Sequence, residues 1–177
     1  MNELSSAGRD ETGGWAGPPA GEAALNVRPA NQVLAQSAQA SVTVLELRKY
    51  THGYAIEVEA TATTESDEPG ELIRSSMAEH RGTPPAVLRF IVQLSDGRSA
   101  STLDHQLVPS LPPAPPYLAS LGGPGYHVTG KQLSSRQSLW LWPTVESAHF
   151  KLMAEWPLFG LSASGISVDG STLATQR

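Results

Sequence analysis

The sequence predicts an all-β protein, an antiparallel two-sheet sandwich with about seven to nine short strands and little helix. Three observations indicate this class: apolar and polar residues alternate in short runs, turn-forming residues separate the runs, and charged residues are few. The chain has 177 residues, which suits one domain, and 16% are charged, against about 25% in an average soluble domain. An immunoglobulin-like or similar sandwich fits this pattern, and an open barrel is the alternative.

The first part of the chain, residues 1–30, is rich in glycine and proline and is expected to form a flexible arm before a single domain over 31–177. This composition buries too little apolar surface to offset the entropy of ordering the chain. Trp15 is an exception, because one indole can bury about 150 to 250 Å² and hold an arm against the domain. A free tail and a pinned arm both stay open, and regular structure is expected from about Val33.

A hairpin is expected next. Residues 41–50 are rich in β-branched and aliphatic side chains, and apolar residues alternate with polar ones in 54–61. Residues 51–53 between them are few enough to form a hairpin loop. The following segment, 71–80, has enough helical spacing for a helix of at most two turns.

The middle of the chain predicts a second hairpin and a long connection. Residues 87–94 alternate as a core strand, the Asp-Gly pair at 96–97 marks a tight turn, and 98–103 can return antiparallel. Five prolines lie within 109–117, and proline has no N–H for a sheet ladder, so 109–125 is expected to be one connection that crosses between the sheets. A weak edge strand is expected within 126–133.

The last part of the chain predicts strands at 138–143, 148–156 and 165–169. The first two are joined by the short segment 144–147, so we expect them to pair. Trp156 would then be a cross-strand neighbour of the two tryptophans in 138–143.

The strand at 138–143 is apolar on both faces. Trp140 and Trp142 share one face, and Leu139 and Leu141 share the other. A two-layer sandwich covers only one of these faces, so the second face should meet the N-terminal arm, a loop or another protein chain.

Several short motifs follow one another along the chain: Tyr50, Gly53 and Tyr54 after a strand, LRFIVQLSDGR at 88–98, the glycine loop at 122–125, LWLWP at 139–143 and EWPLFGL at 155–161. In this order they resemble a group of small uncharacterised actinobacterial proteins, over about 15–168 of the chain. The resemblance implies a β-sandwich and no assigned activity.

Composition and charge disfavour two classes of partner and exclude cysteine chemistry. The chain has 12 basic and 17 acidic residues, a net charge of -5, so we expect neither nucleic acid nor a membrane surface as its partner. It has no cysteine, which excludes disulfides and thiolate sites, and no run of about 18 apolar residues. The first 20 residues are polar where a signal peptide is apolar, so we expect a cytoplasmic protein.

Catalytic and metal motifs are not found in the sequence, so we predict no catalytic residue, no metal site and no cofactor. No G-x-S-x-G motif occurs, and the histidines have no metal-ligand spacing. Asp104 and His105 with a distant serine could form a triad, which is kept as an alternative. The five histidines lie in five different segments: His52, His80, His105, His127 and His149.

The sequence therefore predicts a non-enzymatic protein interaction or assembly module, whose partner is another protein or a second copy of itself. A carbohydrate or small-ligand binder with an exposed aromatic platform is one alternative, and a hydrolase or metal-dependent enzyme built on dispersed His and Asp residues is another. The candidate interaction surface consists of aromatic residues: Trp15, Tyr117, Tyr126, Trp140 and Trp142.

Overall fold

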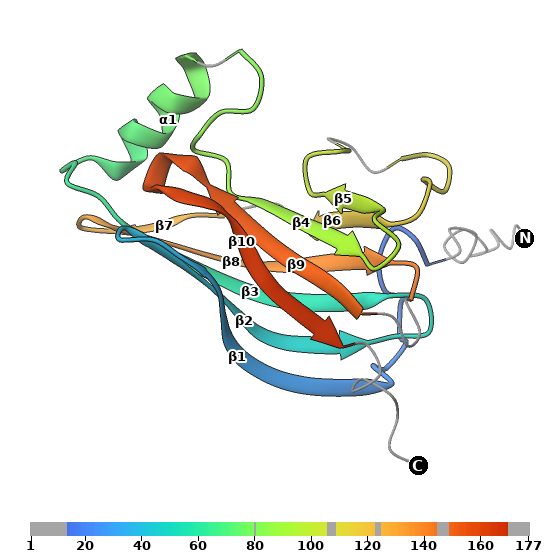
Figure 1. Cartoon of the computed structure of the whole chain (residues 1–177). Helices are drawn as coiled ribbons and strands as arrows, with labels where there is room; N and C mark the ends of the chain where they lie inside the picture. The colour runs from blue at the N-terminus through green and yellow to red at the C-terminus, as the bar shows by residue number, and fades with distance from the viewer. Residues whose placement is uncertain (1–13, 80, 106–108, 123–124, 145–148, 170–177) are drawn as a thin grey trace, which may run out of the picture.

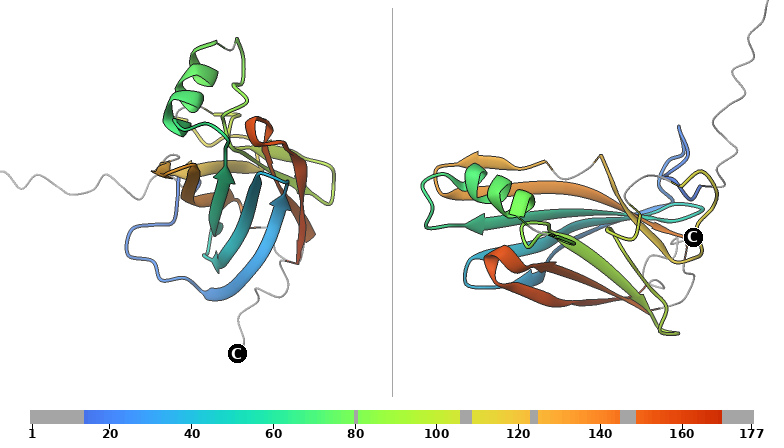
Figure 2. Two further views of the ribbon diagram at one scale, coloured as in Figure 1. Left: turned by 90° about the vertical axis from the view of Figure 1, so that its left-hand side faces the viewer. Right: turned by 90° about the horizontal axis from the view of Figure 1, so that it is seen from above.

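The computed structural model describes residues 14–79, 81–105, 109–122, 125–144 and 149–169. These residues form two antiparallel sheets, one of six strands and one of four, with a single α-helix (Figure 1). Figure 2 shows the two sheets as two layers, one over the other. This arrangement confirms the predicted two-sheet sandwich and excludes the open barrel.

The six-stranded sheet has the order β1-β2-β3-β8-β6, and β7 pairs with β8 on the same side as β6. Its members are β1 (Asn26–Gln36), β2 (Ala40–Lys49), β3 (Tyr54–Thr63), β6 (Tyr117–Leu121), β7 (His127–Thr129) and β8 (Gln132–Trp142).

The four-stranded sheet has the order β10-β9-β4-β5. Its members are β4 (Arg89–Leu94), β5 (Ser99–Ser101), β9 (His149–Trp156) and β10 (Leu161–Asp169), with the 3-10 turn η1 (Pro157–Phe159) between the last two. The helix α1 (Pro69–Glu79) joins the two sheets and lies at one end of the sandwich (Figure 1).

The main core lies between the two sheets and is built by the alternation that the sequence shows. In β9 every second residue is buried, as predicted, and in β4 the same holds from Phe90 to Leu94. The largest side chains that are wholly buried in this core include Tyr54, Ile56, Phe90, Leu139, Leu141, Phe150, Leu152 and Trp156.

Both predicted hairpins are present. β2 and β3 pair antiparallel around the loop 51–53, and β4 and β5 pair around the Asp-Gly turn. In the second hairpin the Leu94 N–H donates to the Arg98 carbonyl at 2.8 Å, which closes the turn.

The expected pairing of the strands at 138–143 and 148–156 is wrong. β8 pairs with β3, β6 and β7, whereas β9 pairs with β4 and β10, so the two strands belong to different sheets. The connection between them therefore crosses the sandwich. Trp156 is consequently not a neighbour of Trp140 and Trp142, because it lies in the other layer.

Three element boundaries also differ from the expectation. β1 begins at Asn26, before the expected Val33, and it tolerates Pro29 because an edge strand needs no N–H on its open side. The segment 109–125 does cross between the sheets, but it contains β6, since the prolines end at Pro116 and later residues can pair. α1 has 11 residues, about three turns, because Ile73 packs on the main core.

The C-terminal part also contains more strand than expected. β10 begins at Leu161 instead of residue 165, and the expected weak strand at 126–133 is β7 followed by the start of β8. The described residues therefore form ten strands, where about seven to nine were predicted. His80 and most of the expected 144–147 connection lie outside the described residues.

Candidate interaction surface

A second, smaller buried cluster lies on the outer face of the six-stranded sheet, away from the main core. Tyr50, Ala55 and Trp140 form it, with the Trp140 ring edge-on to Tyr50 at 5.7 Å between centroids. Trp140 is 0% exposed although it points away from the other sheet. The sequence predicted that this strand is apolar on both faces and that something must cover the second face, and both statements are confirmed.

The cover is the N-terminal arm, which we define as residues 14–25. The Trp140 indole Nε1–H donates a buried hydrogen bond of 3.1 Å to the Gly14 carbonyl. Trp15 is 3% exposed and stands edge-on to Tyr117, with 6.1 Å between ring centroids. Of the two alternatives for the arm, the described part is therefore pinned to the domain.

Near its other end the arm is held through its own carboxylate, that of Glu22. Thr51 donates two hydrogen bonds to Glu22 Oε1, from its hydroxyl at 2.6 Å and from its backbone N–H at 2.9 Å. These bonds favour the charged carboxylate and lower the pKa of Glu22 below its ordinary value. Three residues later the Leu25 N–H donates to the Lys49 carbonyl at 2.7 Å, where β1 begins.

Two glycines make room at close contacts, one between the loop 51–53 and the Trp140 ring and one between the arm and His52. A Cβ on Gly53 would lie 2.5 Å from a ring carbon of Trp140, so only glycine leaves room for the indole there. Gly14 has φ +72°, and a Cβ on it would lie 2.6 Å from the Cβ of His52. The surface is thus shaped by residues from the arm and from the loop 51–53.

The loop 51–53 is also held from the side of β8. The Thr144 N–H donates to the His52 carbonyl at 2.9 Å, and the Thr144 hydroxyl donates to the Thr51 carbonyl at 3.0 Å. The loop that contacts the arm is therefore fixed independently of the arm.

Four of the five predicted surface residues gather near the arm, but three of them are buried. Trp15, Tyr117 and Trp140 are buried and Trp142, which pairs with Tyr117 across β6 and β8, is half-buried. Burial raises the pKa of Tyr117. We name the outer-face residues Tyr50, Thr51, Ala55, Tyr117 and Trp140 the arm site.

Tyr126, the fifth predicted residue, lies elsewhere. Its ring stacks on Trp156 at 5.9 Å, beside the main core, and burial raises its pKa. The Trp156 indole N–H donates to the Ala86 carbonyl at 2.9 Å and its ring meets Phe159 at 4.5 Å. The aromatic residues therefore form two separate groups, because β8 and β9 are in different layers.

An exposed apolar row along β1 was missed by the sequence analysis. Leu25, Val27 and Val33 are 48%, 50% and 49% exposed. Val27 pairs with Arg48 and Val33 pairs with Thr43, so both lie on the outer face. Alternation at 25, 27 and 29 was a usable signal, but Pro29 and the arm-like composition around it concealed the strand.

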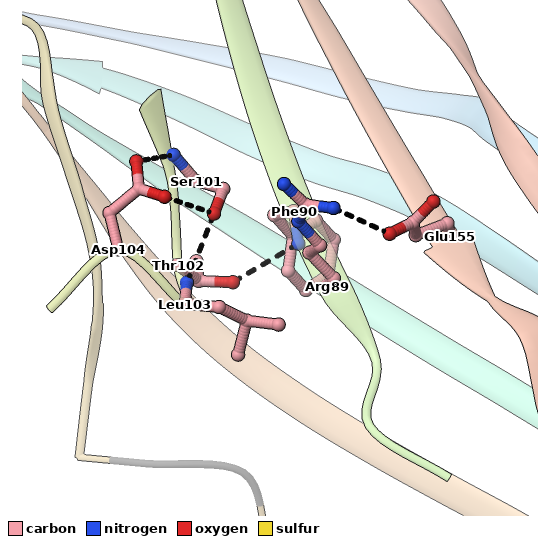
Figure 3. A network of polar contacts seen from close by, with 7 residues as sticks. All are labelled: Arg89, Phe90, Ser101, Thr102, Leu103, Asp104 and Glu155. Carbon is pink, nitrogen blue, oxygen red and sulfur yellow. Dashed lines mark hydrogen bonds and ion pairs between the residues drawn. The ribbon is translucent and has the colours of Figure 1, made fainter. Parts of the chain in front are cut away.

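The outer face of the four-stranded sheet carries a polar network (Figure 3). Arg89 forms an ion pair with Glu155 at 2.9 Å across β4 and β9. Asp104 accepts hydrogen bonds from the Ser101 N–H at 2.7 Å and the Ser101 hydroxyl at 2.9 Å. The nearest serine thus bonds directly to Asp104 without a histidine between them, as in a turn and not as in a Ser-His-Asp triad.

The four described histidines come from four separate segments of the chain. His52, His105, His127 and His149 are all exposed, and His105 contacts the Tyr117 ring at 5.3 Å between centroids. Within the described ranges, no three His, Asp or Glu side chains come close enough to hold a metal ion. In the same part of the chain, no helix has the length and apolar character to cross a bilayer.

Comparisons of the chain with protein-family models, with curated proteins and with solved structures found no match. The resemblance to small actinobacterial proteins therefore stays a prediction. Any function has to be argued from the surface that the structure presents.

Proposed function

We propose that this protein is a non-enzymatic interaction or assembly module that associates with a second copy of itself through the outer face of β1. The observation that carries this proposal is the exposed apolar row of Leu25, Val27 and Val33. Val27 and Val33 lie on the same face of the sheet, and apolar surface exposed on one face is a feature of protein interaction sites.

The size of the row sets what it can contribute. Complete burial of a Val or Leu side chain stabilises by about 1.5 to 3 kcal/mol, so covering the exposed halves of three gives about 2 to 4.5 kcal/mol. A micromolar complex needs about 8 kcal/mol, and a stable interface buries about 1,000 Å² or more in total. The row is therefore the centre of a larger contact that includes neighbouring residues of β2.

The face of β1, and not its backbone edge, is the part that favours association. Pro29 offers no N–H along the edge of β1, and the register of β1 with β2 shifts twice, at 29–32 and at 33–35. Prolines and bulges are features by which edge strands avoid pairing with another chain. A partner that meets the side chains of the outer face does not need this backbone edge.

The ligand-binding alternative has less support. It needs exposed rings, whereas three of the predicted aromatic residues are buried: Trp15, Tyr117 and Trp140.

The experiment is sedimentation velocity on the wild type and on the double variant Val27→Ser/Val33→Ser, up to high micromolar concentration. We expect the wild type to associate and the double variant to stay monomeric. Val128→Ser is the matched control, because Val128 on β7 is 48% exposed but lies on another strand of the same sheet. A wild type that stays monomeric, or association that the double variant retains, would contradict the proposal.

A further inference from the structure

We propose that the arm site is a peptide-binding site, which the arm fills within its own chain and which an extended segment of a partner protein can fill in its place. The ligand class is read from the arm: a Gly-Trp pair followed by a carboxylate, which here stands seven positions after Trp15, at Glu22. This inference goes beyond the proposed function and does not depend on the exposed row of β1.

The arm contacts the domain as a bound ligand does. Between residues 14 and 24 the described backbone forms one backbone–backbone hydrogen bond, from the Glu22 N–H to the Pro19 carbonyl at 3.1 Å, and this bond is internal. The arm adds no strand to the sheet. Side chains and one carbonyl hold it, at the opposite end of the sandwich from α1 (Figures 1 and 2).

Each contact of the arm selects a chemical group. The closeness of His52 and the positive φ require glycine at position 14. The buried Tyr117 ring receives an indole edge-on, which aromatic pairs favour. The two Thr51 donors receive a carboxylate, and hydrogen bonds to a charged acceptor are stronger than neutral ones.

The domain side of the site is positioned without the arm. Trp140 is held in β8 between Ala55 of β3 and Ala119 of β6. Thr144 holds the loop that carries Thr51, as described above. Departure of the arm would uncover an apolar cluster and two fixed donors, and such a surface binds an extended segment with little loss of its own conformational freedom.

The arm and an external segment compete for the site. The arm is joined to the domain by a short tether, which gives it an effective concentration of about 1 mM. For a segment with a Kd of about 100 µM, molecules with the arm bound (the closed form) then outnumber molecules with the arm released (the open form) about tenfold. An external segment with the same contacts then binds the wild type about tenfold more weakly than it binds an empty site. Weakening the arm should therefore strengthen binding from outside.

The experiment uses the full chain and, as probe, a fluorescently labelled peptide with the sequence of residues 14–25, followed by anisotropy. Trp15→Ala in the protein removes the anchor of the arm and leaves every residue of the arm site unchanged. We expect the peptide to bind this variant about tenfold more tightly than the wild type. A peptide whose own Trp15 is replaced by alanine is the control and should bind neither protein.

A second variant reaches the same state by another route. Gly14→Ala places a Cβ against His52 and should also release the arm. If neither variant binds the peptide while both keep the wild-type circular dichroism and thermal transition, the inference is overturned. Equal affinity for the wild type and both variants would overturn it as well.

The source of the segment is tested by mixing. Both proteins carry Val27→Ser/Val33→Ser in this test, which removes the association through β1. We then expect Trp15→Ala protein and protein with the wild-type arm to remain separate in light scattering, because the wild-type arm is occupied in its own chain. A mixed dimer that forms through the wild-type arm would assign the site to a second copy of this chain and would overturn the assignment to a partner protein.

Discussion

Replacement of Trp15 and of Trp156 by alanine removes the same side chain from two almost wholly buried positions. A tryptophan buries about 150 to 250 Å², and at about 25 cal/mol per Å² this area corresponds to about 4 to 6 kcal/mol at either position. Trp156 lies inside the main core, hydrogen-bonded to the Ala86 carbonyl. The core cannot separate locally, so we expect Trp156→Ala to lower the free energy of unfolding by about 3 to 5 kcal/mol.

Trp15 should cost much less, because the arm can leave the sheet while the sandwich stays folded. The loss is then limited to the free energy of docking the arm, and a closed form favoured about tenfold corresponds to about 1.4 kcal/mol. The assay is equilibrium urea denaturation of both variants followed by far-UV circular dichroism, with Phe90→Ala as a second core variant expected to lose about 3 to 5 kcal/mol.

Two results would refute this reasoning. A loss of about 3 kcal/mol or more for Trp15→Ala would show that the arm is part of the cooperative core. A loss below about 1 kcal/mol for Trp156→Ala would show that the assigned inner face of β9 is wrong.

Three further predictions follow from the same geometry. Gly53→Ala should destabilise by about 1 to 3 kcal/mol in thermal melts, because its Cβ would overlap Trp140, whereas Gly70→Ala, with no atom within 4 Å, should not destabilise. The pKa of Glu22 is lowered, so the charged carboxylate stabilises the bound arm fully above about pH 4.3, and this stabilisation is lost as the pH falls through the lowered pKa. Acrylamide quenching of tryptophan fluorescence should therefore rise at acid pH in the wild type. Glu22→Gln should show no such change. Purified protein should carry no stoichiometric metal, and one bound zinc or iron per chain in elemental analysis would contradict this. Stability should be nearly unchanged by alanine at three exposed histidines, His105, His127 and His149.

Local alternation in the sequence was enough to determine which residues face inward. In a strand successive side chains point to opposite faces, so the pattern of 150–156 and of 88–94 predicts the buried face without knowledge of the neighbours. The Asp-Gly turn and the three-residue loop 51–53 predicted two hairpins, because loops of two or three residues with glycine are typical of hairpins. The need to cover Trp140 could be deduced in the same way, from a strand that is apolar on both faces.

Tertiary structure alone decided which strands pair and what covers Trp140. Pairing between distant strands depends on contacts across the whole core, so a short connection at 144–147 did not make β8 and β9 neighbours. The same holds for the arm, whose composition indicates a free tail. It is ordered because Gly14, Trp15 and Glu22 find an indole, a phenol ring and two donors that strands far along the chain bring to one place. A pattern of neighbouring residues contains no information about such a place, since it exists only once the sheet has formed.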